Sequence, residues 1–481
     1  MSSDPDRRAT LLILDGARPD VFRELLEAGD LPNLAEHVVE PGGQSAATTV
    51  FPSTTGVAYL PLLTGCFPGT CDVPGIRWMD VARYGGRPWR DRSHVRSYCG
   101  VQGGLLDSDL SPGVATLFEL EPDSVAICSP VRRGLPGDRV RATAPRAMWG
   151  ALAHYTATYG PLDRTVGRAL AETAAERPRF TFAVFPGVDG VTHHEHPRHP
   201  DVLDLYRAFD RDLGRWVEAG GLDGDHLLAV VSDHGASRME RHRDLDHSLR
   251  ERGLSVLEHP ALWRGSGDVA VMVSGNASAQ LYLRPGERRR RRIGLPELES
   301  GGVEGVPGDL VEQLLAMPEV EIVAGTDGGD VVAATAAGRS RLRAEPRGMI
   351  RYEPGGADVL GLGAEPRSMD PAAWLRESVD GPYPDAPVQL TQLFRSARAG
   401  DLALSAAAAA DLRDFWELPE HRSGHGSLRS EHMRCLAAVN RPVSGPIRTV
   451  DVFATILRHL GMAVPGGVDG RSALAPRAGA P

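Results

Sequence analysis

The sequence predicts an α/β protein in which helices sandwich a mostly parallel central sheet, with a smaller α+β insertion. Three observations lead to this fold class. Short apolar runs that end in polar turns recur along the chain, and segments with helical periodicity lie near them. The stretch from 262 to 387 instead contains many short strands and one clear helix. Alternating strands and helices indicate βαβ units, whose parallel sheets are covered on both faces.

Five apolar runs are the predicted strands of the core sheet. Each is β-branched or otherwise apolar and ends in a polar turn that contains glycine. The runs are Leu11–Leu14, Val125–Cys128, Phe180–Phe185, Leu227–Val231 and Cys435–Val439. From Val202 to Trp216, apolar residues recur at steps of three and four, which predicts an amphipathic helix. The same spacing from Val450 to Leu460, followed by Gly461, predicts a helix that ends at a glycine.

The predicted domain organisation is an α/β core that the insertion interrupts. The core comprises residues 1–261 and 388–481, and the α+β insertion comprises 262–387. Short strands are expected at QLYLR, VEIVAG, DVVAATA, SRLRAE and MIRYE, with a helix around Asp309 to Met317. The arginine run Arg288–Arg292 lies in the insertion. We expect it to form a solvated loop, with anion binding as the alternative.

The composition excludes several classes of enzyme. All 53 basic residues are arginines, so the chain has no lysine. P-loop NTPases, protein kinases and Schiff-base enzymes each need a lysine and are therefore excluded. Arginine, backbone N–H groups or metal ions must bind any phosphate. The formal net charge of −10 argues against binding to duplex nucleic acid.

The N-terminal apolar run has only four residues before Asp15, too short for the core of a signal peptide. No stretch of about 18 apolar residues occurs elsewhere. We therefore expect a cytoplasmic protein without a membrane partner; the sequence carries no indication of the oligomeric state. The five cysteines include no metal-type CxxC pair, and buried thiols are expected, with a Cys66–Cys71 disulfide as the alternative.

Carboxylates and histidines follow three of the predicted strands directly. Asp15 follows LLIL, Asp189 closes TFAVFPGVD, and Asp233 with His234 closes LLAVVSDH. His193 comes four residues after Asp189. In open α/β sheets, ligands bind outside the carboxyl ends of the strands, so these side chains are expected to share one site.

These residue types point to metal-dependent chemistry. Carboxylates and imidazoles together suit zinc or manganese, and clustered carboxylates need a cation to offset their repulsion. The candidates exceed the ligand number of one tetrahedral ion, so two ions are expected. Paired ions recur in phosphatases and nucleases, where they stabilise the attacking and leaving oxygens. The residues alone therefore predict a metal-dependent hydrolase of phosphate esters.

The sequence resembles the alkaline phosphatase superfamily, and within it the type I phosphodiesterase and nucleotide pyrophosphatase branch. The segments that carry the resemblance are LLILDGARPD with LPNL, VFPSTTGVAYLPLLTGCFPG, VDGVTHH, VVSDHG and RSGHGSLRSEHMR. They cover both halves of the core in the family's order, while 262–387 matches only loosely. The resemblance implies an alkaline-phosphatase-like core and two zinc ions, with manganese as the alternative.

The resemblance also implies site residues. The ligands implied for one ion are Asp189, His193 and His425, and those for the other are Asp15, Asp233 and His234. His421 is the rival of His425. In this branch the nucleophile, which also contacts the metal, is a threonine nine residues before the threonine of a TG pair. Counting back from Thr64 gives Thr55, with Thr54 as the neighbouring alternative.

The implied reaction cleaves a phosphodiester or pyrophosphate-type bond of a small-molecule phosphate ester through a phosphothreonine intermediate. Ala58 stands where this branch commonly has an asparagine, and Tyr59 and Arg77 are the candidates for a replacement hydrogen-bond donor. A phosphomonoesterase or phosphonate hydrolase with the same two-metal site is the alternative among enzymes. A non-catalytic metal-binding or interaction protein is the alternative from another class.

Overall fold

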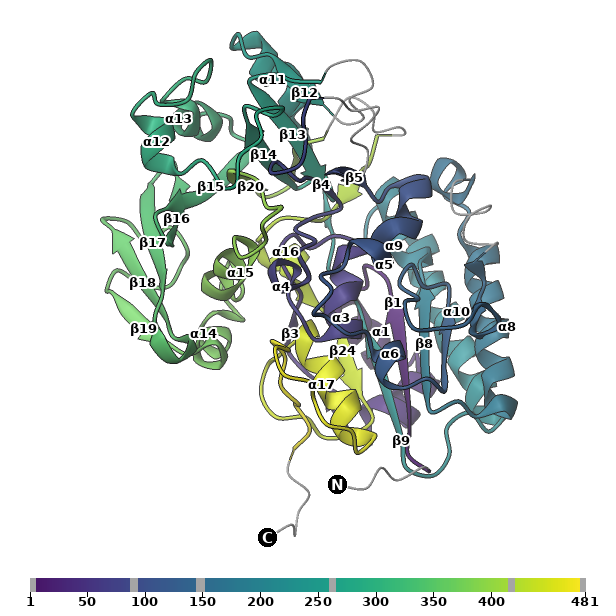
Figure 1. The fold of residues 1–481 in the computed structure, drawn as a ribbon. Helices are drawn as coiled ribbons and strands as arrows, with labels where there is room; N and C mark the ends of the chain where they lie inside the picture. Colours follow the sequence, from purple (N-terminus) through teal and green to yellow (C-terminus); the bar gives the residue numbers. More distant parts are fainter. Residues whose placement is uncertain (1–5, 87–93, 144–151, 259–264, 414–419, 476–481) are drawn as a thin grey trace.

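A computed structural model describes residues 6–86, 94–143, 152–258, 265–413 and 420–475. Its two main sheets lie side by side (Figure 1). The first has seven strands, in the spatial order β2 (Gly43–Gln44), β24 (Ala437–Val439), β9 (His226–Val231), β1 (Arg8–Leu14), β8 (Phe180–Phe185), β6 (Ser124–Ile127) and β7 (Val140–Arg141). Five of these strands, from β9 to β7, are parallel, while β24, near one edge, pairs antiparallel with both β9 and β2. The predicted mostly parallel sheet is therefore confirmed.

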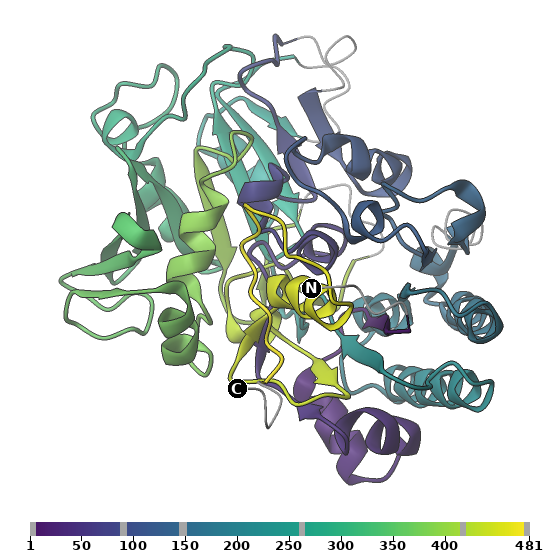
Figure 2. The same cartoon turned by 60° about the horizontal axis from the view of Figure 1, so that its bottom comes forward.

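The second sheet has nine strands and lies to one side of the core (Figures 1 and 2). In spatial order these are β12 (Val256–Glu258), β13 (Val269–Ser274), β14 (Ser278–Leu283), β20 (Leu402–Ala406), β15 (Val320–Asp327), β16 (Asp330–Thr335), β17 (Gly338–Ala344), β18 (Ile350–Gly355) and β19 (Arg367–Met369). All neighbouring strands are antiparallel except β12 and β13. Its helices are α11 (Leu245–Glu251), α12 (Leu295–Glu299), α13 (Leu310–Leu315), α14 (Pro371–Ser378) and α15 (Ala386–Leu393).

This sheet is larger than the insertion predicted at 262–387. Strand β12 lies before that range in the sequence and β20 lies after it. Strand β20 nevertheless belongs to this sheet, because it pairs with β14 on one side and β15 on the other. The first predicted boundary, between 261 and 262, lies outside the described residues.

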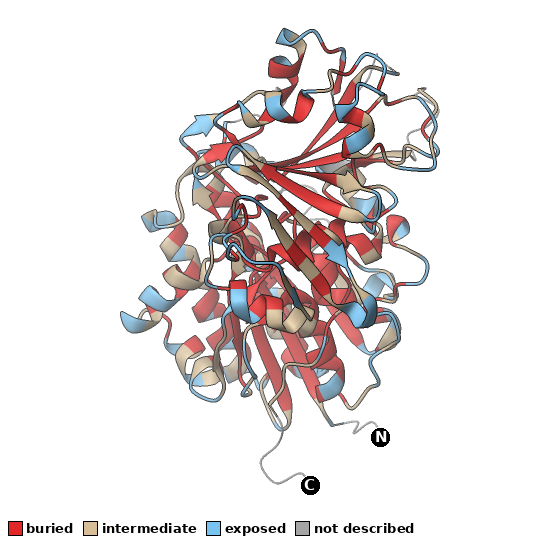
Figure 3. Cartoon of the chain, turned by 90° about the vertical axis from the view of Figure 1, so that its left-hand side faces the viewer, coloured by how far each residue is buried: buried red, intermediate tan, exposed pale blue. Residues whose placement is uncertain are grey.

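Helices cover both faces of the seven-stranded sheet, and its central strands are buried along their length (Figure 3). The principal helices of this part are α1 (Pro19–Glu27), α3 (Leu60–Thr64), α6 (Leu117–Leu120), α8 (Gly160–Glu176), α9 (Gly187–His194), α10 (Pro200–Glu218) and α17 (Thr449–His459). The helices predicted at 202–216 and 450–460 correspond to α10 and α17. Because the strands are buried on both faces, they read as continuous apolar runs in the sequence.

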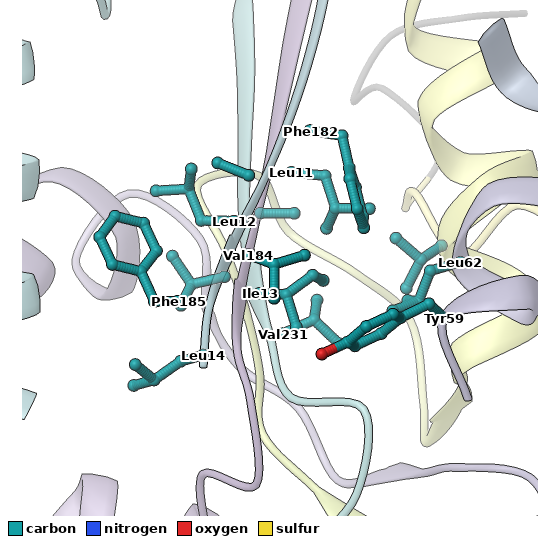
Figure 4. Packing of buried hydrophobic residues seen from close by; sticks show 14 of the residues in the cluster. Leu11, Leu12, Ile13, Leu14, Tyr59, Leu62, Phe182, Val184, Phe185 and Val231 are labelled. Carbon is teal, nitrogen blue, oxygen red and sulfur yellow. The ribbon is translucent and has the colours of Figure 1, made fainter. Parts of the chain in front are cut away.

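Alternate residues of the central strands pack on opposite faces (Figure 4). On one face, the ring of Phe185 contacts Phe209 of α10, with ring centroids 4.8 Å apart. On the other face, Leu11 and Ile13 point toward the side of Tyr59 and Leu62 (Figure 4). Helix α17 packs on α3 at this second face.

The arginine run Arg288–Arg292, which lies between β14 and α12, is only partly solvated. Arg289 pairs with Asp401, which is 1% exposed, and the guanidinium of Arg292 donates to carbonyl oxygens in the turn 394–399. The expectation of a solvated loop is therefore wrong for these two residues, because the buried carboxylate of Asp401 needs a cationic partner.

The structure also bears on the predicted thiols and on the expected absence of membrane-spanning helices. Cys66 and Cys71 are buried thiols that form no disulfide with each other. Within the described ranges, none of the helices has the length and apolarity needed to cross a membrane.

Candidate active site

The predicted ligands gather where the central parallel strands end. Asp15 follows β1, Asp189 and His193 lie on α9 directly after β8, and Asp233 with His234 follows β9. Because parallel strands end at the same edge of a sheet, these residues from distant parts of the chain meet there.

His425 reaches the same edge from the C-terminal part of the chain. It follows β22 (Ser423–Gly424), which pairs with β10 (Ser237–Arg238), a few residues after His234. Resemblance alone implied His425 as a ligand, and the pairing of β10 with β22 brings it to this edge of the sheet.

One group that could hold a metal ion comprises Asp15, Asp233 and His234. Their ligand atoms lie within 4.8 Å of one another. Nε2 of His234 is 3.6 Å from Oδ1 of Asp15 and 3.3 Å from Oδ2 of Asp233. This group has the same members as one of the two implied ligand sets.

A second group comprises Asp189, His234 and His425. Nε2 of His425 is 3.8 Å from Oδ1 of Asp189, and Nε2 of His193 is 3.2 Å from Oδ2 of the same carboxylate. The resemblance implies His193 as the third member of this group, but the structure places His234 there. His234 lies close to His425 because their rings are stacked, with centroids 3.7 Å apart. His234 belongs to both groups, and His193 contacts the second one through Asp189.

Backbone carbonyl groups fix the orientation of all three histidine rings. Nδ1 of His193 lies 2.9 Å from the carbonyl oxygen of Ser423, and Nδ1 of His234 lies 3.1 Å from that of Gly235. Nδ1 of His425 lies 2.8 Å from the carbonyl oxygen of Ser53. A carbonyl oxygen only accepts, so each Nδ1 carries the proton and each Nε2 presents its lone pair to the carboxylates. Histidines that bind metals are held in this way.

The carboxylates also fit a cation. Oδ1 of Asp189 and Oδ2 of Asp233 are buried and have no hydrogen-bond partner among the described residues. Burial raises the pKa of Asp233 to about 7. Burial, together with repulsion from Asp233 and Asp189, raises the pKa of Asp15 well above its ordinary value. One or two metal ions would supply the positive charge that these carboxylates lack.

Histidines make the environment of Asp189 different. Burial alone would raise its pKa, but His193 and His425 outweigh burial and hold that pKa below its ordinary value. Burial, with a further contribution from His234, lowers the pKa of His425 well below its ordinary value. A neutral imidazole is the form in which histidine binds a metal.

The two adjacent threonines face different surroundings. Oγ1 of Thr55 lies 2.8 Å from Nε2 of His234 and 3.4 Å from Oδ1 of Asp15. Thr54 is fully buried, and its Cγ2 packs so closely on Gly275 that a Cβ there would approach within 2.6 Å. The following 3-10 turn, Val57–Tyr59, starts after Gly56 and has no side-chain cap. The hydroxyl of Thr55 therefore faces the ligand groups instead of capping a helix.

Tyr59 and Arg77 differ in what they contact. The buried hydroxyl of Tyr59 donates to Oδ2 of Asp15. Arg77, in β4 (Arg77–Met79), donates to the carbonyl oxygen of Val273 at 3.3 Å, two residues before Gly275. A role for either side chain as a donor to substrate stays a prediction.

The turn between β13 and β14 reaches the site from the second sheet. Gly275 and Asn276 both have positive φ, +59° and +67°, and lie in the three-residue loop between the paired residues Ser274 and Ser278. A Cβ on Gly275 would lie 2.9 Å from Nδ1 of His425. Asn276 lies 3.0 Å from Nδ1 of His421, whose ring is 4.2 Å from that of His193. This turn was not predicted from the sequence, although Gly-Asn between two apolar runs is a hairpin signal.

Asp163 of α8 supports the helix that carries Asp189 and His193. Its Oδ1 accepts the N–H of Gly187, the first residue of α9, at 3.1 Å. Burial raises the pKa of Asp163 to about 8. The carboxyl is therefore protonated in the folded protein at a pH where the unfolded chain has already ionised it.

We expect Asp163→Asn to flatten the dependence of stability on pH. Between the ordinary pKa of 3.8 and about 8, the folded state binds a proton that the unfolded state has released. This lowers the stability of the wild type by up to about 1.4 kcal/mol for each unit of rising pH. Asparagine keeps the acceptor for Gly187 and does not ionise. Urea unfolding between about pH 5 and about pH 8 tests this, and equal slopes for both proteins would contradict it.

A match to a family model identifies the chain as a hydrolase of phosphoric esters. Residues 9–294, more than half of the chain, match the family model for type I phosphodiesterase / nucleotide pyrophosphatase. The chain belongs to this family. It is therefore an enzyme, as the resemblance implied.

Solved structures share the fold over nearly the whole chain. Phosphonoacetate hydrolase from Sinorhizobium meliloti 1021 is 17% identical, with 95% of this chain and 96% of that chain covered and a TM-score of 0.56. Murine ectonucleotide pyrophosphatase / phosphodiesterase 5 is 13% identical over 95% and 96%, with a TM-score of 0.54. The human counterpart is 12% identical over the same shares, with a TM-score of 0.53. No curated protein matches the sequence.

Proposed function

We propose that the protein cleaves a phosphodiester or pyrophosphate-type bond with two metal ions and with Thr55 as the nucleophile. One observation carries the proposal: the hydroxyl of Thr55 lies 2.8 Å from Nε2 of His234, the residue that both ligand groups share. A threonine-to-alanine variant of the murine relative, described as inactive and in complex with AMP, supports a catalytic threonine.

The proposed ligands are the implied ones. They are Asp15, Asp233 and His234 for one ion, and Asp189, His193 and His425 for the other. Zinc is the proposed metal, with manganese as the alternative. When bound, two ions would stabilise the alkoxide of the nucleophile and the charge on the departing oxygen. Two buried carboxylate oxygens of the proposed ligands have no hydrogen-bond partner among the described residues, and Nε2 of each of the three histidines lies within 3.8 Å of a carboxylate oxygen. Both observations support this assignment.

The surroundings of Thr55 favour attack on phosphorus. Nε2 of His234 and Oδ1 of Asp15 are both acceptors, so the hydroxyl hydrogen points to one of them. As Oγ1 bonds to phosphorus it loses its proton to water, and the bond to the leaving oxygen breaks with the electron pair departing on that oxygen. The product is a phosphothreonine whose phosphorus still carries the other substituent of the substrate. Water then hydrolyses this ester and restores the threonine.

A phosphomonoesterase or phosphonate hydrolase is the second candidate. The phosphonoacetate hydrolase, described in complex with phosphonoacetate and phosphonoformate, favours it. So does Ala58, which replaces the asparagine common in the phosphodiesterase branch. The substrate proposed for either activity is a small-molecule phosphate or phosphonate.

Substrate preference tests the choice between the two activities. We expect kcat/KM for bis(p-nitrophenyl) phosphate to exceed that for p-nitrophenyl phosphate by at least about tenfold, equivalent to about 1.4 kcal/mol of transition-state stabilisation. The same comparison includes phosphate release from phosphonoacetate. A higher kcat/KM for the monoester or the phosphonate would contradict the proposed phosphodiesterase activity.

A further inference from the structure

Helix α15 holds the backbone of the loop that carries Thr55. We call residues 51–56 the threonine loop. Oε1 of Gln389 accepts the N–H of Phe51 at 2.9 Å, and Nε2 of Gln392 donates to the carbonyl oxygen of Phe51 at 3.0 Å. The two glutamines are three residues apart, so they lie on one face of the helix. Both main-chain groups of Phe51 are thereby fixed from one element.

The other half of each amide is also bonded. Nε2 of Gln389 donates to Oδ2 of Asp385 at 2.8 Å, and Oε1 of Gln392 accepts the N–H of Gly69 at 2.9 Å. Gln389 is 0% exposed and Gln392 is 1% exposed. Burying an amide is unfavourable unless its hydrogen bonds are replaced, and a bonded amide fixes direction in a way that apolar packing does not. Two such amides at one contact set the orientation of the loop against the helix.

A buried ion pair anchors α15 to the core. Arg448, at the start of α17, donates two hydrogen bonds to the carboxylate of Asp385, at 2.7 and 2.6 Å. Asp385 is 0% exposed and Arg448 is 7% exposed. Such bidentate pairs restrict geometry as well as adding energy. The helix that holds Phe51 is therefore itself held by α17, which packs on α3 beyond the threonine loop.

The middle of the threonine loop is fixed from the side of His425. The hydroxyl of Ser53 donates to the carbonyl oxygen of Ser427 at 3.1 Å, and the carbonyl oxygen of Ser53 contacts Nδ1 of His425 at 2.8 Å. Phe51 and Ser53 thus bind to different elements, two residues apart. Thr55 follows by two more residues, so these two attachments determine where its hydroxyl lies.

We propose that Gln389 and Gln392 are positioning residues that place the hydroxyl of Thr55 for attack by fixing Phe51. This inference rests on the proposed role of Thr55. Misplacing a reacting group by about 1 Å can lower a rate by about 10²-fold. The hydrogen bonds of the two glutamines go to Phe51, Gly69 and Asp385, none of which is a proposed metal ligand. Their loss should therefore affect the chemical step more than metal content.

The variant Gln392→Glu separates the two bonds of this side chain. Its ionised carboxylate still accepts the N–H of Gly69 but presents an acceptor to the carbonyl oxygen of Phe51. The protonated acid would donate to that oxygen as the amide does, so the loss of kcat should grow with rising pH. We expect kcat for bis(p-nitrophenyl) phosphate to fall by about 10- to 100-fold, with KM within about threefold of the wild-type value and metal content unchanged. Gln389→Met, which removes the acceptor for the N–H of Phe51, should give the same pattern and serves if the first variant does not fold.

A matched control is Gln313→Glu on α13. The side-chain amide of Gln313 donates to the carboxylate of Asp309, at the start of the same helix. Helix α13 packs on β15 of the second sheet, so this hydrogen bond does not involve the threonine loop. We expect its kcat to equal the wild-type value. Wild-type kcat in folded Gln392→Glu or Gln389→Met would overturn the positioning role. A loss of bound metal in parallel with kcat would also overturn it, since the effect would then be on the ligand groups.

The Thr55→Ala variant distinguishes failure of the positioning role from failure of the proposed function. If Thr55→Ala is fully active, the proposed nucleophile is wrong. If Thr55→Ala is inactive while Gln392→Glu and Gln389→Met are fully active, Thr55 keeps its role and only the positioning by α15 is refuted.

Discussion

Thr55→Ala is expected to lower kcat by at least about 10³-fold while the protein keeps its metal. The substitution removes the one hydroxyl that lies 2.8 Å from Nε2 of His234 and 3.4 Å from Oδ1 of Asp15. The six proposed protein ligands stay in place. Steady-state kinetics with bis(p-nitrophenyl) phosphate and metal analysis of the purified variant check this result.

The control for this prediction is Thr54→Ala. Thr54 has the same side chain but is fully buried and packs on Gly275. We expect it to retain kcat within about tenfold, because its hydroxyl is not among the contacts of the ligand groups. Thr55→Ser should recover part of the activity because it restores the hydroxyl. An inactive Thr54→Ala together with an active Thr55→Ala would move the nucleophile to Thr54.

Asp233→Asn is expected to remove bound metal and activity together. Oδ1 of Asp233 accepts the N–H of Gly16 at 3.2 Å, and Oδ2 is buried without a partner among the described residues. Asparagine keeps the shape and an acceptor for Gly16 but loses the charge that holds a cation. We expect metal content to fall from about two ions per chain to one or fewer, and kcat to fall by at least about 10³-fold.

The matched control is Asp210→Asn on α10. Asp210 is 1% exposed and accepts the N–H of Leu34 at 2.8 Å, so it is also a buried aspartate with a backbone partner. It lies outside both ligand groups, and metal content should stay at the wild-type value. Unaltered metal content in Asp233→Asn would contradict the ligand role of Asp233.

The central sheet and most of the site could be predicted because the signals are local. Each of Asp15, Asp189 and Asp233 comes directly after, or within a few residues of, an apolar run that forms a buried strand. Strand position alone then brings the three carboxylates to one edge of the sheet. The group of Asp15, Asp233 and His234 follows from this logic.

Other features depend on tertiary contacts that leave no local signal. The strand β20 reads as a short apolar segment, and only its pairing with β14 and β15 makes it part of the second sheet. Gln389 and Gln392 look like ordinary polar residues of a helix, since a glutamine is usually exposed. Their burial against Phe51 becomes visible only in the folded chain. The stacking of His234 on His425, which places His234 in both ligand groups, is likewise a contact across the sheet edge.

The most direct test of the proposed nucleophile is to trap the phosphorylated enzyme. Acid quenching during turnover of bis(p-nitrophenyl) phosphate preserves the covalent intermediate, in which the phosphorus bonded to the threonine still carries one p-nitrophenyl ester. Because the chain has no lysine, trypsin cleaves only after arginines, and the peptide between Arg23 and Arg77 contains the whole threonine loop. We predict a covalent p-nitrophenyl phosphoryl group on Thr55 of this peptide, absent from Thr55→Ala. An active enzyme with no modified peptide, or with the group on another residue, would contradict the proposed mechanism.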